Sequence, residues 1–300
     1  MATVDVIIPA FNAAKFLPAA LESVGSQTFA DWQIILVDDG STDNTPDIVA
    51  PFLERFGSKI RYIHQTNRGL PAARNAAIRA STSPFLALLD ADDAWMPSRL
   101  TESIETLTAR PAAGIAYGLI TYIDSAGKAL GTFEGNAGPA EGRIASSIYM
   151  RKVELPCPTV TFRRSCIQKV GLFDETMRST EDRDLWLRIA LHYEVAFIPK
   201  VLAYYRVSPD SMSANSQRML EAQLQFIRKH YGSAGCGILE RQISVARAHK
   251  QRAEALRRQG KAGAALKSAL QSLLIYPLDL ANVRTAGSLF FNWVRHPSNA

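Results

Sequence analysis

The sequence predicts an α/β fold with a mostly parallel, doubly wound sheet, and three observations support this. Short apolar runs without polar alternation, typical of strands buried on both faces, recur in the first third of the chain. Segments with apolar residues at helical spacing separate these runs. Acidic residues directly follow two of the runs, and sheets of this kind bind ligands beyond the carboxyl ends of their strands.

The first third of the chain alternates strand and helix. Asn12 is the expected N-cap of the first helix, and Ser41, Thr42 and Asp43 supply capping oxygens for the second. Pro71 falls at the start of the third helix, where proline is tolerated best. The expected strands cover 4–9, 33–37, 60–64 and 85–89, and the expected helices cover 13–26, 46–56 and 71–80.

Beyond Asp93 the pattern becomes mixed. A hairpin is expected around Ser125-Ala126-Gly127, and small residues over 135–142 indicate a loop. The remaining expected elements are helices over 97–109, 165–170 and 181–192 and strands over 115–123, 128–133, 159–162, 195–198 and 201–207.

The C-terminal quarter is expected to be helical. A basic amphipathic helix is predicted over 238–259 and a more apolar helix over 262–276. Residues 289–294 combine aromatic side chains with flanking Arg284 and Arg295. Two interpretations of this cluster are open, which are contact with a membrane interface and packing into the core.

Charge is distributed unevenly along the chain. Residues 218–300 carry 13 Lys and Arg against four Asp and Glu, a net charge of +9, whereas residues 1–217 carry a net charge of −3. A basic region of this kind suits anionic lipid, an acidic partner or nucleic acid. The main body has no basic stripe with interleaved aromatic residues, which disfavours nucleic acid.

Cysteine usage and the N-terminus bear on the cellular compartment. Cys157, Cys166 and Cys236 show neither a pairing pattern nor a Cys-x-x-Cys motif, which favours a reducing compartment. The N-terminus lacks the pattern of a signal peptide, and no apolar run reaches the ~18–20 residues that span a bilayer. We therefore expect a cytoplasmic protein.

Two acidic clusters stand out. Asp38 and Asp39 follow the second expected strand, and Asp90, Asp92 and Asp93 follow the fourth. Like charges held a few Å apart repel, and partial burial adds a cost of desolvation. A divalent cation relieves this repulsion, and an Asp-x-Asp pattern offers the hard oxygen ligands that suit Mg²⁺ or Mn²⁺. The alternative is a solvated acidic turn in which Asp93 caps the next helix.

Five motifs follow one another at the expected strand and helix ends. They are Val-Asp-Val-Ile-Ile-Pro-Ala-Phe-Asn, Ile-Leu-Val-Asp-Asp-Gly-Ser-Thr-Asp, Asn-Arg-Gly-Leu-Pro-Ala-Ala-Arg-Asn, Leu-Asp-Ala-Asp-Asp and Thr-Glu-Asp-Arg-Asp-Leu-Trp-Leu-Arg. In this order they resemble the family 2 glycosyltransferases over about residues 3–215. The resemblance implies the GT-A nucleotide-diphospho-sugar transferase fold, with a mixed acceptor half and a C-terminal helical extension outside the match.

The resemblance also implies an inverting, metal-dependent transfer of a sugar from a nucleoside-diphosphate donor to a hydroxyl. Asp39 matches the position that reads the base, which favours UDP- or dTDP-type donors. Phe11 matches a position that packs on the nucleotide, and Asp90 matches one that contacts the ribose. The nucleotide-sugar-binding residues implied in this way are Pro9, Phe11, Asp38, Asp39, Arg68, Asp90, Ala91 and Asp93.

Metal and catalytic roles are implied in the same way. Asp92 matches the ligand of Mn²⁺ or Mg²⁺, which neutralises the leaving diphosphate. Asp182, beside Glu181, matches the acidic pair of the family and is the candidate general base. The alternative is that Glu181 and Asp182 only stabilise the start of a helix through its dipole. Arg74 and Asn75 are either ligand contacts or structural residues.

The sequence departs from the family pattern at Ser208, where a histidine is common, and this casts doubt on a protein ligand from that segment. Two alternatives to an active transferase are open. One is a degenerate transferase kept as a binding module. The other is a sugar-phosphate nucleotidyltransferase, which is disfavoured because residues 5–25 hold only Gly25 instead of a glycine-rich phosphate loop.

We expect a glycosyltransferase domain over 1–217, with a nucleotide-sugar-binding half over 1–110 and an acceptor half over 111–217. A basic helical extension follows over 218–300. The expected partners are a nucleoside-diphosphate sugar and a glycan or lipid-linked glycan of cell-envelope polysaccharide biosynthesis, with no nucleic acid. The basic helices suggest peripheral contact with anionic lipid at the inner face of the membrane.

Overall fold

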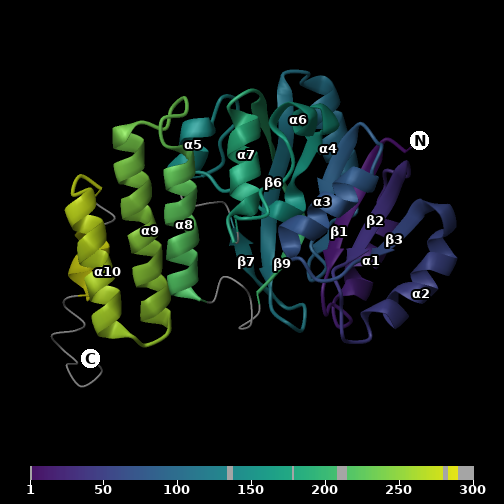
Figure 1. The fold of residues 1–300 in the computed structure, drawn as a ribbon, viewed down its shortest axis with the longest axis horizontal. Coiled ribbons are helices and arrows are strands. Elements are labelled where there is room, and N and C mark those ends of the chain that lie inside the picture. The colour runs from purple at the N-terminus through teal and green to yellow at the C-terminus, as the bar shows by residue number, and fades with distance from the viewer. Residues whose placement is uncertain (1, 134–137, 178, 208–214, 280–282, 290–300) are drawn as a thin grey trace. The chain divides into compact units, whose positions relative to one another are not determined.

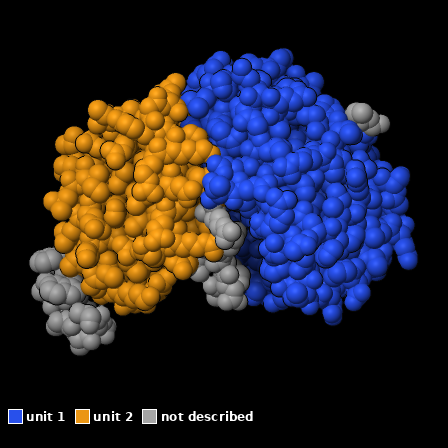
Figure 2. Space-filling model, viewed as in Figure 1, with its two compact units in different colours: residues 1–144, 153–176, 181–208 blue, residues 145–152, 177–180, 209–300 orange. Residues whose placement is uncertain are grey.

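The structure, a computed structural model, describes residues 2–133, 138–177, 179–207, 215–279 and 283–289. The chain divides into two compact units (Figure 2). Unit 1 comprises 1–144, 153–176 and 181–208, and unit 2 comprises 145–152, 177–180 and 209–300. Two short segments from the middle of the chain therefore belong to unit 2, and the domain limits expected at 110 and 217 stay predictions.

Unit 1 is built on one mixed sheet in the order β3-β2-β1-β4-β8-β6-β9-β5, with β7 paired to β6 (Figure 1). The first four of these strands run parallel. β8 joins them to β6 and is antiparallel to both neighbours, whereas β6 and β9 run parallel. The strands are β1 (Val4–Ala10), β2 (Trp32–Asp38), β3 (Ile60–His64), β4 (Phe85–Leu88), β5 (Ala94–Trp95), β6 (Ala113–Ile123), β7 (Ala129–Phe133), β8 (Thr161–Arg163) and β9 (Glu194–Arg206).

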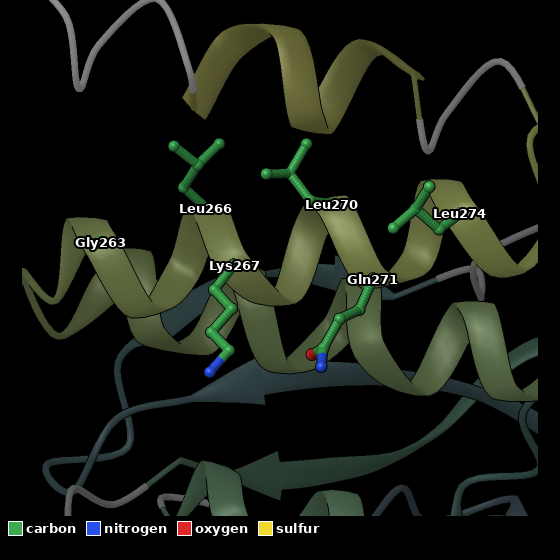
Figure 3. A pocket seen from close by; sticks show the side chains of 6 residues that line it. All are labelled: Gly263, Leu266, Lys267, Leu270, Gln271 and Leu274. Carbon is green, nitrogen blue, oxygen red and sulfur yellow. The ribbon is translucent and has the colours of Figure 1, made fainter.

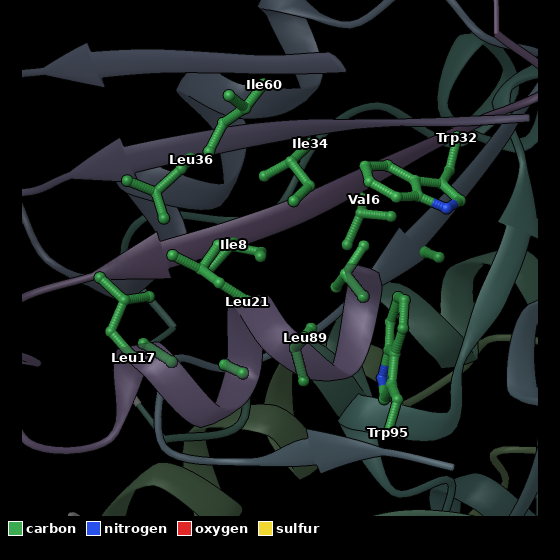
Figure 4. Close-up of a cluster of buried hydrophobic side chains, with 14 of the residues drawn as sticks. Val6, Ile8, Leu17, Leu21, Trp32, Ile34, Leu36, Ile60, Leu89 and Trp95 are labelled. Carbon is green, nitrogen blue, oxygen red and sulfur yellow. The ribbon is translucent and has the colours of Figure 1, made fainter. Parts of the chain in front are cut away.

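Helices cover both faces of the parallel part. Because successive strand residues point to opposite faces, Val6 and Ile8 of β1 share one face and point toward Leu17 and Leu21 of α1 (Figure 4). α3 packs against β1 and β2, and every residue of β1 is buried, as expected for a doubly wound sheet. The helices of unit 1 are α1 (Leu17–Gly25), α2 (Thr45–Phe56), α3 (Leu70–Ala80), α4 (Arg99–Ala109), α6 (Arg164–Val170) and α7 (Glu181–Ala190).

The helix cap expected at Asn12 is wrong, and so is the alternative in which Asp93 caps a helix. Asn12 has a left-handed backbone with φ of 49°, and its side-chain oxygen accepts from the Thr42 amide at 2.8 Å, so it links two loops while α1 begins at Leu17. Asp93 does not cap a helix, because the next residues form β5 and α4 begins at Arg99.

The two strands expected over 195–198 and 201–207 form one strand, β9. Its parallel pairing with β6 continues past two register shifts beside Gly118 and Leu119, so the expected break is only an irregularity. Pro199 and Lys200 have no partner on β6, but the pairing resumes at Val201, so the strand continues through the expected break.

Unit 2 is helical, as the sequence predicts for the C-terminal quarter. The Tyr149 hydroxyl donates to the Ile227 carbonyl at 3.0 Å, and Ser244 donates to the Tyr149 carbonyl at 2.6 Å. No helix among the described residues has the length and apolar character needed to cross a membrane. The helices of unit 2 are α5 (Ala145–Tyr149), α8 (Ser216–His230), α9 (Ile238–Arg258), α10 (Ala262–Ile275) and residues 283–289.

α9 and α10 pack as a pair. Ser268 and Ser272 of α10 donate to carbonyls of α9, and Leu256, Leu266 and Leu289 share an apolar cluster. Apart from Leu289, the aromatic cluster expected over 289–294 lies outside the described residues, as does the segment that begins at Ser208.

We predict that Gly118→Val lowers the free energy of unfolding by about 1–3 kcal/mol. A Cβ at this position would lie 2.6 Å from Leu202 Cδ1 and 2.9 Å from the Lys200 carbonyl oxygen, so β6 and β9 would have to separate. Chemical denaturation measures the change. The control is Gly263→Ala, where the Cβ meets open space and a helix former should raise stability by up to ~1 kcal/mol. Wild-type stability of Gly118→Val would contradict this close packing.

Candidate active site

Most of the site residues expected from the first third of the chain lie at the carboxyl ends of β2, β1 and β4, which are neighbours in the sheet, and Arg68 follows β3. Pro9 is buried within β1, and Phe11, just beyond it, is 51% exposed. Ala10 pairs with Asp38, the last residue of β2. This edge is where doubly wound sheets bind ligands.

Asp38 is fully buried and fixes the loop after β2. One carboxylate oxygen accepts from the Ser41 amide at 2.9 Å, and the other accepts from the Tyr62 hydroxyl at 2.7 Å and lies 3.4 Å from His64 Nδ1. Burial by itself raises the pKa of Asp38, but the hydrogen bonds from Ser41, Tyr62 and His64 outweigh it and lower the pKa below its ordinary value. Asp38 therefore stays ionised at neutral pH.

Asp39 fixes the segment over 65–69. Its Oδ1 accepts from the Gln65 side chain at 2.7 Å and the Arg68 amide at 3.0 Å, and its Oδ2 accepts from the Gly69 amide at 2.7 Å. Each carboxylate oxygen has two lone pairs, so Oδ2 retains capacity for a further donor. The Arg68 side chain is exposed and forms an ion pair with Glu175 at 3.0 Å.

Arg74 brings the two later acidic motifs together. This side chain of α3 is 2% exposed. Its Nη2 donates to Asp90 Oδ1 at 2.6 Å, beyond β4, and its Nη1 donates to Glu181 Oε1 at 2.8 Å, at the start of α7. The motif after β4 and the acidic pair on α7 therefore belong to one site.

The two acidic residues at the start of α7, Glu181 and Asp182, differ in their burial. Burial raises the pKa of Glu181 to about 7, Arg74 opposes this rise, and the neighbouring Asp182 adds to it. Asp182 is only half-buried, and its Oδ1 accepts from the Arg183 amide at 2.6 Å. Glu181 is thus the enclosed member of the pair and Asp182 the accessible member.

Asp93 is enclosed by the end of β9. Its Oδ1 accepts from the Arg206 amide at 2.8 Å, and burial together with Asp92 and Asp90 raises its pKa well above the ordinary value. Arg206 donates through its side chain to the backbone oxygens of Asp92 and Asp124 and stacks on Phe16 at 4.4 Å from the ring centroid. Arg206 therefore holds the turn that contains the buried Ala91.

Asp92 is the exposed carboxylate of the site. Protein atoms on one side still desolvate it, and together with the charge of Asp90 they raise its pKa to about 6. Its own backbone amide donates to the carboxylate, and no other residue that the structure describes forms a hydrogen bond with it.

The described residues contain no group of three His, Cys, Asp or Glu side chains arranged to hold a metal ion. One hard, exposed carboxylate fits a Mg²⁺ or Mn²⁺ ion that takes the rest of its ligands from water and diphosphate oxygens. The residues are therefore compatible with a metal that the donor helps to hold.

The sequence alone did not identify Arg74 as the residue that links the two acidic motifs. Arg74 and Glu181 are 107 positions apart, so no local pattern pairs them. Asn75 has a structural role, because its side chain donates to the Phe173 carbonyl and accepts from the Phe173 amide, both at 2.9 Å. Tyr205 of β9 was not predicted as a site residue either. It lies near the carboxylates of the site, and burial and then the charges of Asp93, Asp90, Asp92 and Asp182 raise the pKa of its phenol.

The sheet order and the carboxylates at its strand ends define a protein of the GT-A class. The model of glycosyl transferase family 2 matches residues 5–167, and the chain belongs to this family. It is therefore a glycosyltransferase, and the predicted fold class and family are confirmed.

Similar proteins agree with this assignment. An uncharacterized glycosyltransferase of Nostoc sp. is 31% identical over 78% of this chain and 77% of its own length. The Escherichia coli UDP-Glc:alpha-D-GlcNAc-diphosphoundecaprenol beta-1,3-glucosyltransferase WfgD is 28% identical over 73% of this chain and 83% of its own length. The mannosyltransferase PcManGT of Pyrobaculum calidifontis, solved with GDP-Man and Mn²⁺, shares the fold with a TM-score of 0.64 and 19% identity, over 99% of this chain and 81% of its own.

We predict that Asp39→Asn loosens the segment over 65–69. The substitution removes the charge and one acceptor, so the Arg68 and Gly69 amides lose strong hydrogen bonds and should exchange with solvent about tenfold faster. Hydrogen–deuterium exchange read by NMR measures this. Asp31→Asn, which alters an exposed bond to Thr3, is the control and should leave both amides unchanged. Equal protection in the two variants would show that Asp39 does not order the segment.

Proposed function

We propose that this chain catalyses inverting transfer of a sugar from a nucleoside-diphosphate donor to a hydroxyl of a glycan or lipid-linked glycan. The observation that carries the proposal is the contact of Arg74 with both Asp90 and Glu181, because it joins the donor-side carboxylates and the acidic pair in one site. A single displacement needs a base for the acceptor hydroxyl and stabilisation of the leaving diphosphate.

Asp182 is the general base of the proposal. It takes the hydroxyl proton while the acceptor oxygen attacks the anomeric carbon from the face opposite the diphosphate. The new glycosidic bond forms as the bond to the diphosphate oxygen breaks, which inverts the anomeric centre. Asp182 is preferred over Glu181 because it is half-buried and accessible, whereas Glu181 is enclosed and ion-paired with Arg74.

The donor occupies the carboxyl ends of β2, β1 and β4 in this proposal. Asp39 accepts from the base, which favours UDP- or dTDP-type donors, and the exposed Phe11 packs on the nucleotide. The name of WfgD includes UDP-Glc, in line with this choice, whereas PcManGT was solved with GDP-Man. The other proposed nucleotide-sugar contacts come from Pro9, Asp38, Arg68, Asp90, Ala91 and Asp93.

Asp92 is the proposed ligand of Mn²⁺ or Mg²⁺. When bound, the cation neutralises the charge that develops on the leaving diphosphate. Support comes from the exposed carboxylate of Asp92, which the other described residues leave unbonded, and from the Mn²⁺ in PcManGT.

We predict opposite defects for Asp92→Ala and Asp182→Asn. Asp92→Ala should lose the Mn²⁺-dependent part of UDP binding, because the cation loses its protein ligand. Asp182→Asn should bind UDP normally and slow transfer by about 10²–10⁴-fold, because the base is gone. Calorimetry with UDP and Mn²⁺, and transfer from a panel of nucleotide sugars to a lipid-diphosphate-linked GlcNAc, measure the two effects. Near-normal turnover of Asp182→Asn would exclude it as the base.

Unit 2 offers a surface for the proposed contact with anionic lipid. A groove along α10 is lined by the apolar Leu266, Leu270 and Leu274, with Lys267 at its rim (Figure 3). Leu274 is 82% exposed and Leu278 is 79% exposed. Exposed leucines on a segment with a net charge of +9 favour a negatively charged bilayer, where the apolar side chains enter the interface and the basic ones meet phosphate.

We predict that the protein co-sediments with phosphatidylglycerol vesicles and not with phosphatidylcholine vesicles. Replacing both Leu274 and Leu278 by Gln should weaken binding at least about tenfold, since burying one leucine contributes about 1.5–3 kcal/mol. Leu130→Gln is the control, because this exposed leucine lies on β7 of unit 1. Equal binding to both lipids, or no effect of the double substitution, would reject this surface.

A further inference from the structure

Arg74 has an unusual set of partners for a buried arginine. Its two terminal nitrogens contact different carboxylates, Asp90 and Glu181, and Nη2 also lies 3.3 Å from the Cys157 Sγ. Its guanidinium carbon lies 5.5 Å from the ring centroid of Phe173. The side chain is thus clamped from several directions, and its charge is matched by two acidic residues of the site.

We propose that Arg74 is a positioning residue that sets the separation between the donor side and the base side of the site. The planar guanidinium presents its donors in a fixed fork, so it holds Asp90 and Glu181 at one spacing. Glu181 precedes Asp182 in the first turn of α7, so anchoring Glu181 also anchors the proposed base. The inference rests on the proposed function, because it assumes that Asp182 is the base.

Arg74 constrains the carboxylates at both ends, Asp90 and Glu181. Nη2 engages only Oδ1 of Asp90, which fixes the orientation of a carboxylate expected near the ribose. Nη1 engages Oε1 of Glu181, a group that would otherwise be a buried, repelling neighbour of Asp182. Losing Arg74 would therefore release both carboxylates at once, and a displacement of about 1 Å at a reacting group can cost about 10²-fold in rate.

Arg99 shows that arginine burial alone does not produce this arrangement. Arg99 is also fully buried, but its side chain donates to the backbone oxygens of Pro158 and Val160 and to the Thr161 hydroxyl, and it stacks on Trp95 at 4.2 Å. Within the described residues, none of its side-chain hydrogen bonds goes to a carboxylate. Arg99→Lys is therefore a matched control for the loss of a buried guanidinium.

The test is a double-mutant cycle with Arg74→Lys and Glu181→Gln. A lysine keeps the charge but cannot hold two carboxylates at a fixed spacing. We expect each single variant to lower kcat about 10²-fold, and the double variant to be no slower than the slower single variant, because the same link is already broken. UDP affinity, measured by calorimetry, should change far less than kcat. Arg99→Lys should lower the melting temperature and leave kcat within about threefold of wild type.

Multiplying effects in the double variant, or wild-type kcat in Arg74→Lys, would overturn the inference. If Arg74→Lys does not fold, Glu181→Gln alone decides, because it removes the charge that Arg74 holds at one end of the link: unchanged kcat rejects the role and a slow, UDP-binding enzyme supports it. Failure of the proposed function gives a different pattern, in which wild type transfers no sugar from any donor or Asp182→Asn retains turnover.

Discussion

The repulsion between carboxylates gathered at one edge of the sheet is the constraint on which this structure depends. Different groups reduce this repulsion at each carboxylate. The Ser41 amide and the Tyr62 hydroxyl stabilise the ionised Asp38, and the amides of Arg68 and Gly69 hold Asp39. Arg74 compensates two further carboxylates. Asp92 stays exposed and receives no hydrogen bond from another described residue, and this is the carboxylate that we propose as the ligand of a cation.

Most of unit 1 could be predicted because the relevant information is local. Continuous apolar runs gave the positions of β1 to β4 to within one residue at most ends, and proline or glycine marked many boundaries. The predictions failed where contacts between residues far apart in the sequence determine the local structure. Asn12 accepts a hydrogen bond from Thr42 instead of capping α1. Pairing with β6 keeps β9 one strand, although the apolar pattern of β9 is interrupted.

The candidate site could be predicted in part for the same reason. Strand-end motifs located the carboxylates, but nothing in the sequence indicates which of them is enclosed and which is accessible. That division depends on α3, α7 and β9 meeting around the strand ends, and the ion pair between Arg74 and Glu181 spans 107 positions. The sequence also did not predict the structural role of Asp39. The carboxylate expected to read the base also orders the segment over 65–69. If Asp39 reads the base as proposed, the same side chain both recognises the donor and orders this segment.

The short strand β8 has a consequence for how the two parts of the sheet are coupled. Its pairing with β4 involves three residues of each strand and its pairing with β6 only two, so a narrow seam joins the parallel strands to the rest of the sheet. Few backbone bonds cross this seam, and they make little demand on side-chain identity. A change in the strands and loops beyond the seam is therefore transmitted to the register of β1 to β4 through few backbone bonds. The two parts of the sheet are thus weakly coupled to each other, although they form one continuous sheet.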